Sequence, residues 1–457
     1  MKDLKVVTNV NESISAPLIK KNRILFLDSV RGIALLGILL MNITAQGQAY
    51  IFYDKLDLSQ SITGANLWVW VAEMGFFEGT MRGIFSILFG AGSYLLIKRL
   101  EKQYTGLEPA DIYYRRVLWL LFFGLVNAFL FLWPGDILYP YALCGLLIFP
   151  FRNLSPKTLL LIAFLLIAFG TYRENRMLFD RKETIVKGKL VEGMEKKKQK
   201  LTEEQKGELA KYKGFKEKKS STGYMNEAKM ETQKVQGKNY AEIFEVYRDE
   251  NMQIQSVFFY NSWWDILLFF FIGMALLKSG FIEGKMNTGI YLTVMILGIA
   301  AGLWFNYQMM IKQYQYKFDG VILTEKVPFV VYQLRRVVQT LGYLSMFILM
   351  YKVNIFRRIM DVFAPVGQMA FTNYLMQSII TSILFFGFGL FGTLQRYELY
   401  YVVALIWIFQ IILSHIWLRY FYFGPFEWVW RSLTYLKKPA FLKKRQGLEG
   451  GISAAGG

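Results

Sequence analysis

The chain has 457 residues, of which 54% are hydrophobic and 17% aromatic, and its formal net charge is +19. Apolar runs long enough to cross a bilayer recur along it, which indicates a polytopic membrane protein rather than a soluble one. The positive charge is spread over short loops, a polar segment and the tail, and no nucleic-acid motif is present. Anionic lipid headgroups are therefore the expected partners of the loop lysines and arginines. The one cysteine, Cys144, excludes a disulfide framework and a thiolate metal cluster.

We predict an all-α bundle of about ten transmembrane helices, because a spanning helix needs roughly 20 apolar residues. The expected spans are 24–45, 79–97, 117–133, 137–151, 157–172, 262–278, 287–306, 329–351, 363–391 and 400–420. Lys and Arg concentrate in alternate short loops, so both termini are expected to be cytoplasmic. The predicted parts are a cytoplasmic segment 1–23, a first membrane half 24–172, a polar extracytoplasmic loop 173–256, a second membrane half 257–422, and a cytoplasmic interfacial helix with a basic tail, 423–457.

The first span carries three polar side chains, Asp28, Arg31 and Asn42, in an otherwise apolar run. Charged groups in a membrane segment are costly unless they are paired or hydrated, and are therefore functional candidates. Asp28 and Arg31 are one helical turn apart and can form an ion pair. The eleven residues from Arg31 to Asn42 make about three turns and rise about 16 Å, so the three side chains share one helix face.

In the second span, Glu78 and Arg82 have the i,i+4 spacing of a helix ion pair. Small residues recur at Gly79, Gly83 and Gly90, and such a seam lets helix backbones approach closely in membranes. Two interpretations remain open: a structural pair beside a packing seam, or Glu78 at the outer mouth of a cavity as an acid, base or acceptor ligand. The seam also allows a homodimer, although an internal helix is the commoner partner.

Asn127 and Asp136 flank the turn between the third and fourth spans, where Pro134 and Gly135 lie. Asp136 precedes a helix, so capping exposed backbone N–H groups is one expected role. The alternative is a buried carboxylate that faces the same cavity as Asn127.

The segment 173–256 is dense in Lys and Glu. Its residues favour long polar helices, but its apolar content is too low for an independent core, and partial disorder is compatible with this composition. A solvated surface is the simpler explanation of the charge. The alternative is a lysine-rich collar that captures an anionic acceptor at the outer surface.

In the ninth span, Asn373 and Gln377 recur at four-residue spacing and form a polar stripe. Hydrogen bonds between helices explain one such stripe. Together with Asn42, Glu78 and Asn127, however, the stripe predicts a shared polar interior.

The lone histidine, His415, lies near the end of the last span and is interpreted as an interfacial residue. No metal-binding cluster, Walker loop, dinucleotide glycine motif or nucleophile elbow is present, so no metal is expected, and ATP-driven transport and redox chemistry have no support. After that span, Gly424 and Pro425 predict a turn, followed by a short tryptophan-rich interfacial helix.

Five blocks of the sequence resemble the YeiB family of bacterial inner-membrane proteins, a domain of unknown function. These blocks are Leu27-Asp28 through Arg31-Gly32 with Asn42; Leu88-Phe89-Gly90-Ala91-Gly92; Gly135-Asp136-Ile137-Leu138; Met369 through Gln377; and Gly424-Pro425 with Glu427-Trp428 and Trp430-Arg431. The resemblance covers most of the chain outside the polar loop. It implies a multi-pass protein of the bacterial plasma membrane.

The YeiB family is itself similar, distantly, to the transmembrane acyltransferases, which include heparan-glucosaminide acetyltransferase and the O-antigen acetylases. Many of those enzymes have an Arg in the first span followed eleven residues later by a His that is thought to pass an acyl group across the membrane. Here the corresponding residues are Arg31 and Asn42. YeiB relatives often have a histidine shortly before the Gly-Asp-Ile-Leu block, where this chain has Asn127. A neutral amide cannot act as a general base, so a buried carboxylate, Glu78 or Asp136, would have to replace the histidine.

The leading hypothesis is a membrane acyltransferase-like protein that uses acyl-CoA and no other cofactor. Asp28, Arg31 and Arg82 would bind the anionic donor, and Asn42 would position a carbonyl group as an oxyanion-type hydrogen-bond donor. Asn127, Asn373 and Gln377 would line the cavity, while Glu78 and Asp136 would face the acceptor. The alternative is a transporter or a lipid- or small-molecule-binding protein that keeps the scaffold without the chemistry.

Overall fold

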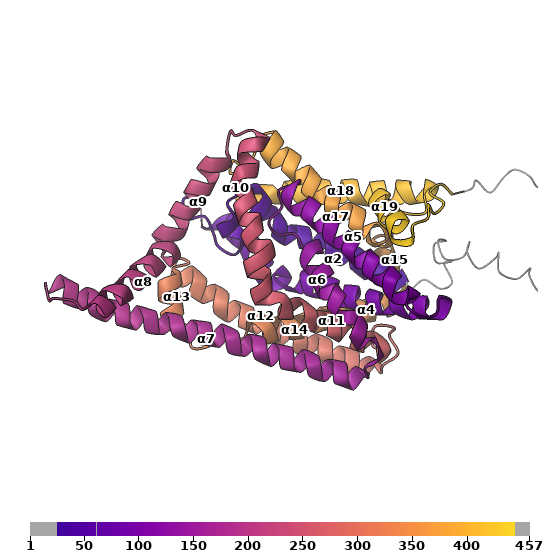
Figure 1. Ribbon diagram of the computed structural model, residues 1–457, viewed down its shortest axis with the longest axis horizontal. Helices are drawn as coiled ribbons and strands as arrows, with labels where there is room; N and C mark the ends of the chain where they lie inside the picture. Colours follow the sequence, from indigo (N-terminus) through magenta and orange to yellow (C-terminus); the bar gives the residue numbers. More distant parts are fainter. Residues whose placement is uncertain (1–24, 61, 444–457) are drawn as a thin grey trace, which may run out of the picture.

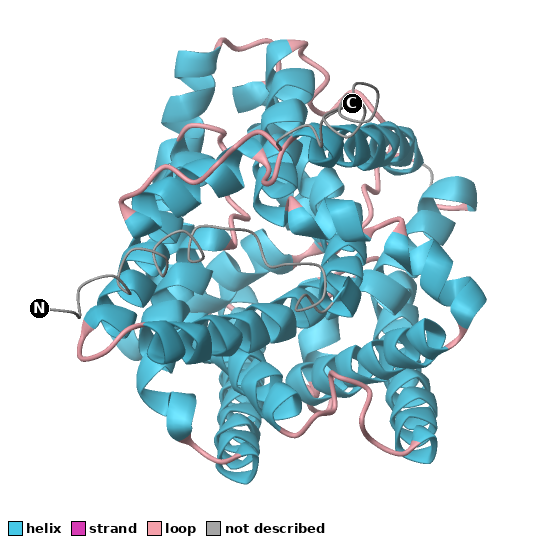
Figure 2. Ribbon diagram, turned by 90° about the vertical axis from the view of Figure 1, so that its right-hand side faces the viewer, coloured by secondary structure: helices cyan, strands magenta, loops and turns pink. Residues whose placement is uncertain are grey.

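The computed structural model describes residues 25–60 and 62–443, and these form a helical bundle with a helical cap at one end (Figure 1). The predicted segment 1–23 and the tail after residue 443 lie outside the described residues. In the described part of the chain the only β-type pairing is an isolated bridge between Phe421 and Leu442. Figure 2, viewed along the bundle, shows helices and connecting loops throughout.

The first part of the chain contributes α2 (Leu25–Gly47), η2 (Tyr50–Tyr53), α3 (Gly64–Ala72), η3 (Glu73–Phe77), α4 (Thr80–Gln103), α5 (Glu108–Phe129), α6 (Leu138–Ile148), η4 (Phe149–Asn153) and α7 (Pro156–Lys196). The cap contributes α8 (Glu203–Lys219), α9 (Ser221–Val235), α10 (Tyr240–Gln253) and η5 (Ile254–Phe258). The remainder forms α11 (Phe259–Lys278), α12 (Thr288–Gln315), α13 (Gly320–Lys326), α14 (Tyr332–Lys352), α15 (Asn354–Asp361), α16 (Ala364–Gln368), α17 (Ala370–Ser382), η6 (Ile383–Gly387), α18 (Arg396–Tyr420) and α19 (Pro425–Tyr435).

Seven of the described helical segments are long and apolar enough to span a membrane: α2, α3–η3–α4, α5, α7, α11, α12 and α18. The prediction of an all-helical membrane protein is thus confirmed at this coarser level. The predicted span 137–151 contains α6, which has only 11 residues. The predicted span 363–391 is broken into α16, α17 and η6, because α16, with Pro365 in its first turn, ends at Gln368 and a new helix begins at Ala370.

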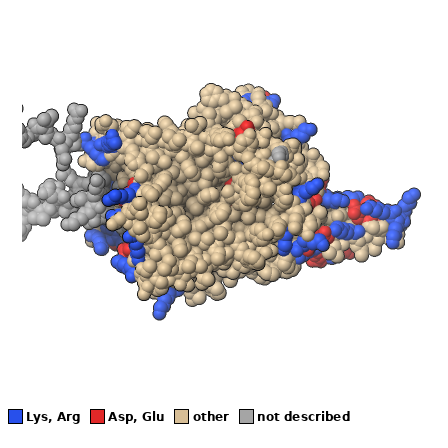
Figure 3. All heavy atoms as spheres, turned by 180° about the vertical axis from the view of Figure 1, so that it is seen from behind, with Lys and Arg blue, Asp and Glu red and all other residues tan. Residues whose placement is uncertain are grey.

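We call the end of the bundle that carries Arg31, Lys98, Arg116, Arg152 and Arg431 the basic end, and the opposite end, where α9 and α10 lie, the cap end. Between them the surface in Figure 3 is a broad band with few charged side chains, as a lipid-facing belt requires. The basic end is the one that the loop charges predict to be cytoplasmic.

Helix α2 is the centre of the bundle, because 19 of its 23 residues are buried. A helix that is apolar around its whole circumference is stable only when neighbouring elements cover it. Among its few partly accessible side chains are Arg31 and Asn42. The polar face of this helix therefore points to spaces inside the protein rather than to lipid.

Two glycines allow α2 and α16 to touch backbone to backbone. A Cβ on Gly367 would overlap the carbonyl oxygen of Asp28, and one on Gly32 would overlap that of Phe363. We expect Gly367→Ala to lower the free energy of unfolding by about 1–3 kcal/mol, the usual cost of overpacking. Thermal unfolding in detergent checks this. Gly207→Ala is the control, because Gly207 lies on α8 facing open space; if the two variants melt alike, the close contact is unimportant.

Helix α7 does not end at the membrane boundary expected near residue 172. It continues without interruption for 41 residues, a length of about 60 Å, and with α8 forms the projecting hairpin that carries clustered Lys and Glu in Figure 3. Buried apolar residues of α9 and α10, such as Tyr224 and Tyr247, pack against side chains from the rest of the bundle, including Trp70 and Phe385. The apolar side chains of α9 and α10 are therefore buried against the helices of the bundle.

Within the cap, Glu231 of α9 accepts hydrogen bonds from the backbone N–H of Tyr50 (3.0 Å to Oε2) and from the Tyr247 hydroxyl (3.3 Å). The pKa of Glu231 is raised from 4.5 to about 8, chiefly by burial and also by the nearby carboxylates of Glu250 and Glu227, while the two donors act in the opposite direction. Because the folded-state pKa is raised, the stability that this group contributes is fully present below about pH 4.5 and is lost as the pH rises through about 8.

The melting temperature of the wild-type protein should accordingly fall between pH 6 and about pH 9, and Glu231→Gln should flatten this dependence. Scanning fluorimetry at a series of pH values measures it. The exposed Glu245→Gln change on α10 serves as the control and should keep the wild-type slope. A wild-type profile that is flat over this range would contradict the assignment.

Candidate functional site

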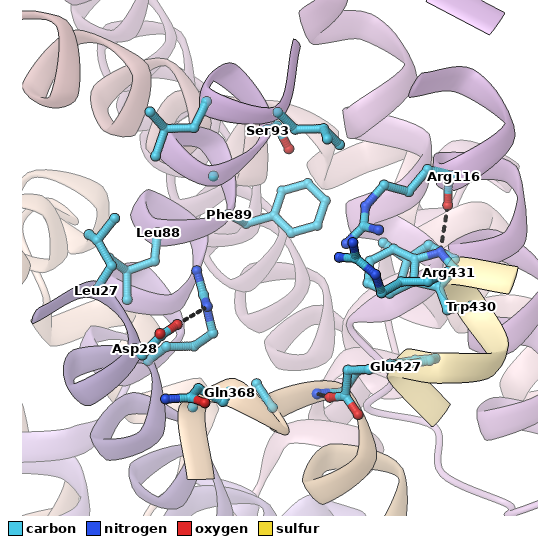
Figure 4. A pocket seen from close by; sticks show the side chains of 18 of the residues that line it. Leu27, Asp28, Leu88, Phe89, Ser93, Arg116, Gln368, Glu427, Trp430 and Arg431 are labelled. Atoms are coloured by element: carbon cyan, nitrogen blue, oxygen red, sulfur yellow. Dashed lines mark hydrogen bonds and ion pairs between the residues drawn. The ribbon is translucent and has the colours of Figure 1, made fainter. Parts of the chain in front are cut away.

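A cavity of about 690 Å³ opens at the basic end between α2, α4, α5, α16, α17 and α19 (Figure 4). Small-molecule sites usually have volumes of about 300–1,000 Å³. Its apolar wall includes Leu27, Leu88, Phe89, Leu120 and Phe371. The cavity is therefore large enough, and apolar enough, to hold an organic ligand with a hydrocarbon part.

The charged lining of this cavity is strongly unbalanced. Six cationic side chains line it, namely Arg31, Lys98, Arg99, Lys102, Arg116 and Arg431, against two carboxylates, Asp28 and Glu427. Both carboxylates are already engaged by protein groups, as described below. The cavity thus combines a surplus of positive charge with apolar walls, which favours an amphiphilic anion.

Arg31 and Asp28 form the ion pair that their spacing predicts. The Arg31 Nη1 and Asp28 Oδ1 atoms are 3.0 Å apart, and the Arg31 side chain remains 28% accessible. In Figure 4 Asp28 lies on one side of the cavity, across from Arg116 and Arg431. Asp28 therefore orients a guanidinium group that still faces the open space.

Arg116 of α5 and Arg431 of α19 lie together on the other side (Figure 4). The Arg116 guanidinium stacks 3.6 Å from the ring centroid of Trp430, whose indole N–H donates to the Arg116 carbonyl oxygen at 2.8 Å. Arg116 experiences repulsion from both Arg31 and Arg431. Guanidinium groups brought together in this way repel one another, and a bound anion would relieve that repulsion.

Glu427 ties α19 to the rest of the wall. Its Oε1 accepts hydrogen bonds from the backbone N–H groups of Phe371 (2.8 Å) and Thr372 (3.0 Å), and its Oε2 accepts one from the Thr372 hydroxyl. These N–H groups belong to the first turn of α17, where an anion is favourable to the helix dipole. The carboxylate thus holds the interfacial helix in place beside the cavity.

Two buried phenols, those of Tyr141 and Tyr374, are part of the cavity lining. The Tyr374 hydroxyl accepts a hydrogen bond from the Ile137 N–H at 3.1 Å and donates one to Asp136 Oδ1 at 3.4 Å. Asp136 is also held by Asn127 Nδ2 (2.7 Å) and by the Tyr139 N–H (2.8 Å).

Asp136 fulfils the capping interpretation of its position, and it is a buried carboxylate bonded to Asn127, but neither residue lines the cavity. Its bond to Tyr139 caps the start of α6, and the carboxylate also stands behind the Tyr374 hydroxyl at the cavity wall. Asp136 lies in the connection between α5 and α6, and burial raises its pKa to about 7, although its hydrogen bonds act in the opposite direction. A carboxyl group with such a pKa can exchange a proton near neutral pH.

The predicted pairing of Glu78 with Arg82 is wrong. The polypeptide turns at Glu78 and Gly79 and α4 begins only at Thr80, so the two residues do not share a helix. Glu78 instead pairs with Arg335 at 2.5 Å and accepts a hydrogen bond from Tyr332 at 2.8 Å. Arg82 pairs with Asp265 of α11 at 3.2 Å.

The polar stripe of the ninth span lies between helices and not around the cavity. Asn373 donates to the Ser414 hydroxyl at 3.0 Å, and Gln377 donates to Gln410 at 3.0 Å, both on α18. Asn42 also lies away from the cavity lining. Of the predicted site residues, only Asp28 and Arg31 line the cavity, with Asp136 and Asn127 behind it, so the single shared polar interior does not form.

Sequence reasoning missed Arg116, Arg431, Tyr141 and Tyr374 as cavity residues. In the sequence, Arg116 is one of the loop cations that indicate topology, and Arg431 belongs to the block that includes the interfacial helix. Glu73 and Asp265 were missed as buried charges, although both stand in apolar segments, where the rule applied to the first span would have found them.

These features define an all-helical membrane protein with a cationic, apolar-walled cavity at one end. Residues 276–437 match the family described as "Protein of unknown function (DUF418)". The chain is 28% identical over 445 residues to the uncharacterized protein YxaH of Bacillus subtilis (strain 168), covering 94% of this chain and 98% of that protein. It is 27% identical over 419 residues to the uncharacterized protein YeiB of Escherichia coli (strain K12), covering 89% and 95%.

A third relative is the uncharacterized 39.9 kDa protein in the amylase 3' region of Bacillus acidopullulyticus, which is 28% identical over 429 residues, covering 94% of this chain and 99% of that protein. No solved structure matches the chain. The predicted resemblance to the YeiB family is therefore confirmed. None of these matches is named as an acyltransferase.

Proposed function

We propose that the cavity at the basic end binds an acyl-bearing molecule through its phosphate-containing headgroup, and that the protein passes the acyl group to an acceptor. The observation that carries this proposal is the position of three guanidinium groups, those of Arg31, Arg116 and Arg431, around an apolar cavity of about 690 Å³. Arginine is the residue best suited to phosphate recognition, because its donors form a planar fork. Acyl-CoA combines such a headgroup with a hydrocarbon chain.

In the proposed reaction, the thioester C–S bond breaks as a C–O bond forms to a hydroxyl of the acceptor, and the hydroxyl proton ends on the thiol of coenzyme A. Tyr374, which lines the cavity, and Asp136, which lies behind it, can relay this proton. In this reaction they would perform the proton transfer that a histidine performs in the acyltransferases. Asn42 lies outside the cavity and has no role in this step.

The second candidate function is that of a non-catalytic protein that binds or moves a lipid or a small anion in the same cavity. Two observations favour it. Asn127 is an amide bonded to Asp136, and a ring nitrogen of His415 is bonded to the Ile411 carbonyl oxygen at 2.9 Å. Neither supplies a free imidazole base at the cavity.

Calorimetry on the purified protein in lipid nanodiscs tests the proposal. The ligands are coenzyme A, acetyl-CoA and longer acyl-CoAs, and mass spectrometry identifies any copurified molecule. Tighter binding of acyl-CoA than of coenzyme A, followed by an acylated product, supports the transfer reaction. A copurified non-thioester lipid without any acylated product supports the second candidate. Absence of acyl-CoA binding at every chain length overturns the donor assignment.

A further inference from the structure

A second accessible cation, Arg82, lies on α4 outside the basic-end cavity. Arg82 stands in the first turn of α4, and its side chain remains 40% accessible. Its partner Asp265 is only 11% accessible, and Arg336, which pairs with the same carboxylate, is 1% accessible. Arg82 is therefore the accessible member of a buried charge cluster.

The surroundings of Arg82 show that its accessible surface faces the interior of the protein. Its electrostatic neighbours are Tyr53 of η2, Tyr141 of α6, Tyr332 of α14 and Glu78, so groups from several separate elements surround it. Arg82 is not among the residues that line the basic-end cavity, whose wall on α4 extends only to Phe85. The space that Arg82 faces is therefore separate from that cavity and lies toward the cap end.

The carboxylates of this cluster are already engaged. Arg82, Arg335 and Arg336 lie near Glu78, Asp265 and Glu174; Glu78 is occupied by Arg335 and Tyr332, and Glu174 accepts a hydrogen bond from Gln333. Asp265 is shared, because Arg336 Nη1 lies 3.2 Å from the same Oδ2 atom that Arg82 approaches. An accessible guanidinium group within a membrane bundle must be hydrated or bound to an anion.

We propose that Arg82, with the phenols of Tyr53 and Tyr141, binds the anionic group of a hydroxyl-bearing acceptor that enters from the cap end. The anionic group is a phosphate or a carboxylate. The identification of this molecule as the acceptor rests on the proposed function, whereas the anion site itself does not.

Tyr141 connects the two sites. It lines the basic-end cavity, and its hydroxyl bonds to the Ser86 hydroxyl and donates to the Arg82 carbonyl oxygen at 3.3 Å. Under this proposal, Tyr141 is the residue that a ligand anchored at Arg82 and a donor held in the cavity have in common. This arrangement suits transfer between two compartments without an open channel.

Cysteine labelling from each side of the membrane tests the proposal. Cys144 is buried, so Cys144→Ala provides a cysteine-free background. In that background, Tyr53→Cys, Arg31→Cys and the exposed Ser59→Cys are treated with a charged, membrane-impermeant methanethiosulfonate in right-side-out and inverted vesicles. We expect Tyr53→Cys and Ser59→Cys to react from the same side, and Arg31→Cys from the other.

Glycerol 1-phosphate is the probe for the anion site and uncharged glycerol its control. We expect the phosphate to slow labelling of Tyr53→Cys, and Arg82→Gln to raise the concentration needed for protection about tenfold or more. Arg82→Lys keeps the positive charge, so it should raise this concentration by less than Arg82→Gln does. Labelling of Ser59→Cys at an unchanged rate shows that each variant is folded.

Labelling of Tyr53→Cys only from the Arg31 side, or no labelling while Ser59→Cys reacts, overturns the second site. Labelling without protection by the phosphate, or protection that survives Arg82→Gln, overturns the anion assignment. If acyl-CoA does not bind in the calorimetry described above, the donor assignment is overturned but the anion site at Arg82 is not. The two proposals can therefore fail independently.

Discussion

Replacing Arg396 with glutamine is expected to lower the free energy of unfolding by about 3–5 kcal/mol, the usual cost of removing one partner of a buried ion pair. Arg396 Nε lies 2.5 Å from Glu73 Oε2, and the two side chains are 3% and 1% accessible. Arg396 also donates to the carbonyl oxygens of Phe52 and Lys55, at 3.1 and 2.8 Å. Its loss would leave both the carboxylate and these carbonyl groups without their donor.

Thermal unfolding in detergent micelles, followed by tryptophan fluorescence, measures the effect. Arg248→Gln is the matched control, since Arg248 is an exposed arginine on α10 at the same end of the molecule; its effect should stay within about 0.5 kcal/mol. The double variant Glu73→Gln with Arg396→Gln should lower the free energy of unfolding by less than the sum of the two single effects, because neither charge of the pair is then left buried without its partner. Strict additivity would show that the two groups do not act as a pair.

Reversing the charge of Arg116 is expected to weaken acyl-CoA binding by about 100-fold or more. Arg116→Glu would remove one of the three guanidinium groups of the cavity and place a carboxylate opposite the headgroup. The side chain lies against Trp430, so Arg116→Gln should cause a smaller loss, confined to the missing charge. Calorimetry in nanodiscs measures both variants.

Arg357→Glu is the control for this experiment, because Arg357 lies on α15, has a side chain 51% accessible, and is not part of the cavity lining. It changes the charge of the protein by the same amount. If both reversals weaken binding equally, the attraction comes from the overall charge and not from the cavity. An unchanged melting temperature in each variant separates lost binding from lost folding.

The sequence located most helices correctly, because apolar runs of spanning length have few alternatives to a helix in a membrane. It did not locate α3 and η3, which occupy residues expected to form a connection, since the short apolar stretch from Leu67 to Phe77 is interrupted by Glu73. The partner that makes Glu73 tolerable, Arg396, is more than 300 residues away in the chain. Local patterns cannot reveal such a pair.

The candidate site shows the same limit. The contact between Asp28 and Arg31 follows from helical spacing alone, and it was predicted. The approach of Arg116 to Arg431 depends on how α19 folds back against α5, which only the tertiary structure determines. Polar residues that share a stripe, such as Asn373 and Gln377, turned out to bond a neighbouring helix because each amide needs a partner and α18 supplies the nearest ones.

The bonds of Glu427 have a kinetic consequence. The same carboxylate completes the first turn of α17 and fixes α19, which supplies Trp430 and Arg431 to the cavity. Moving α19 aside therefore leaves a helix end uncapped, so departure of a large occupant carries the activation cost of breaking that cap. Residence time in the cavity would then be governed by the opening of an interfacial helix as well as by the strength of the contacts with the ligand.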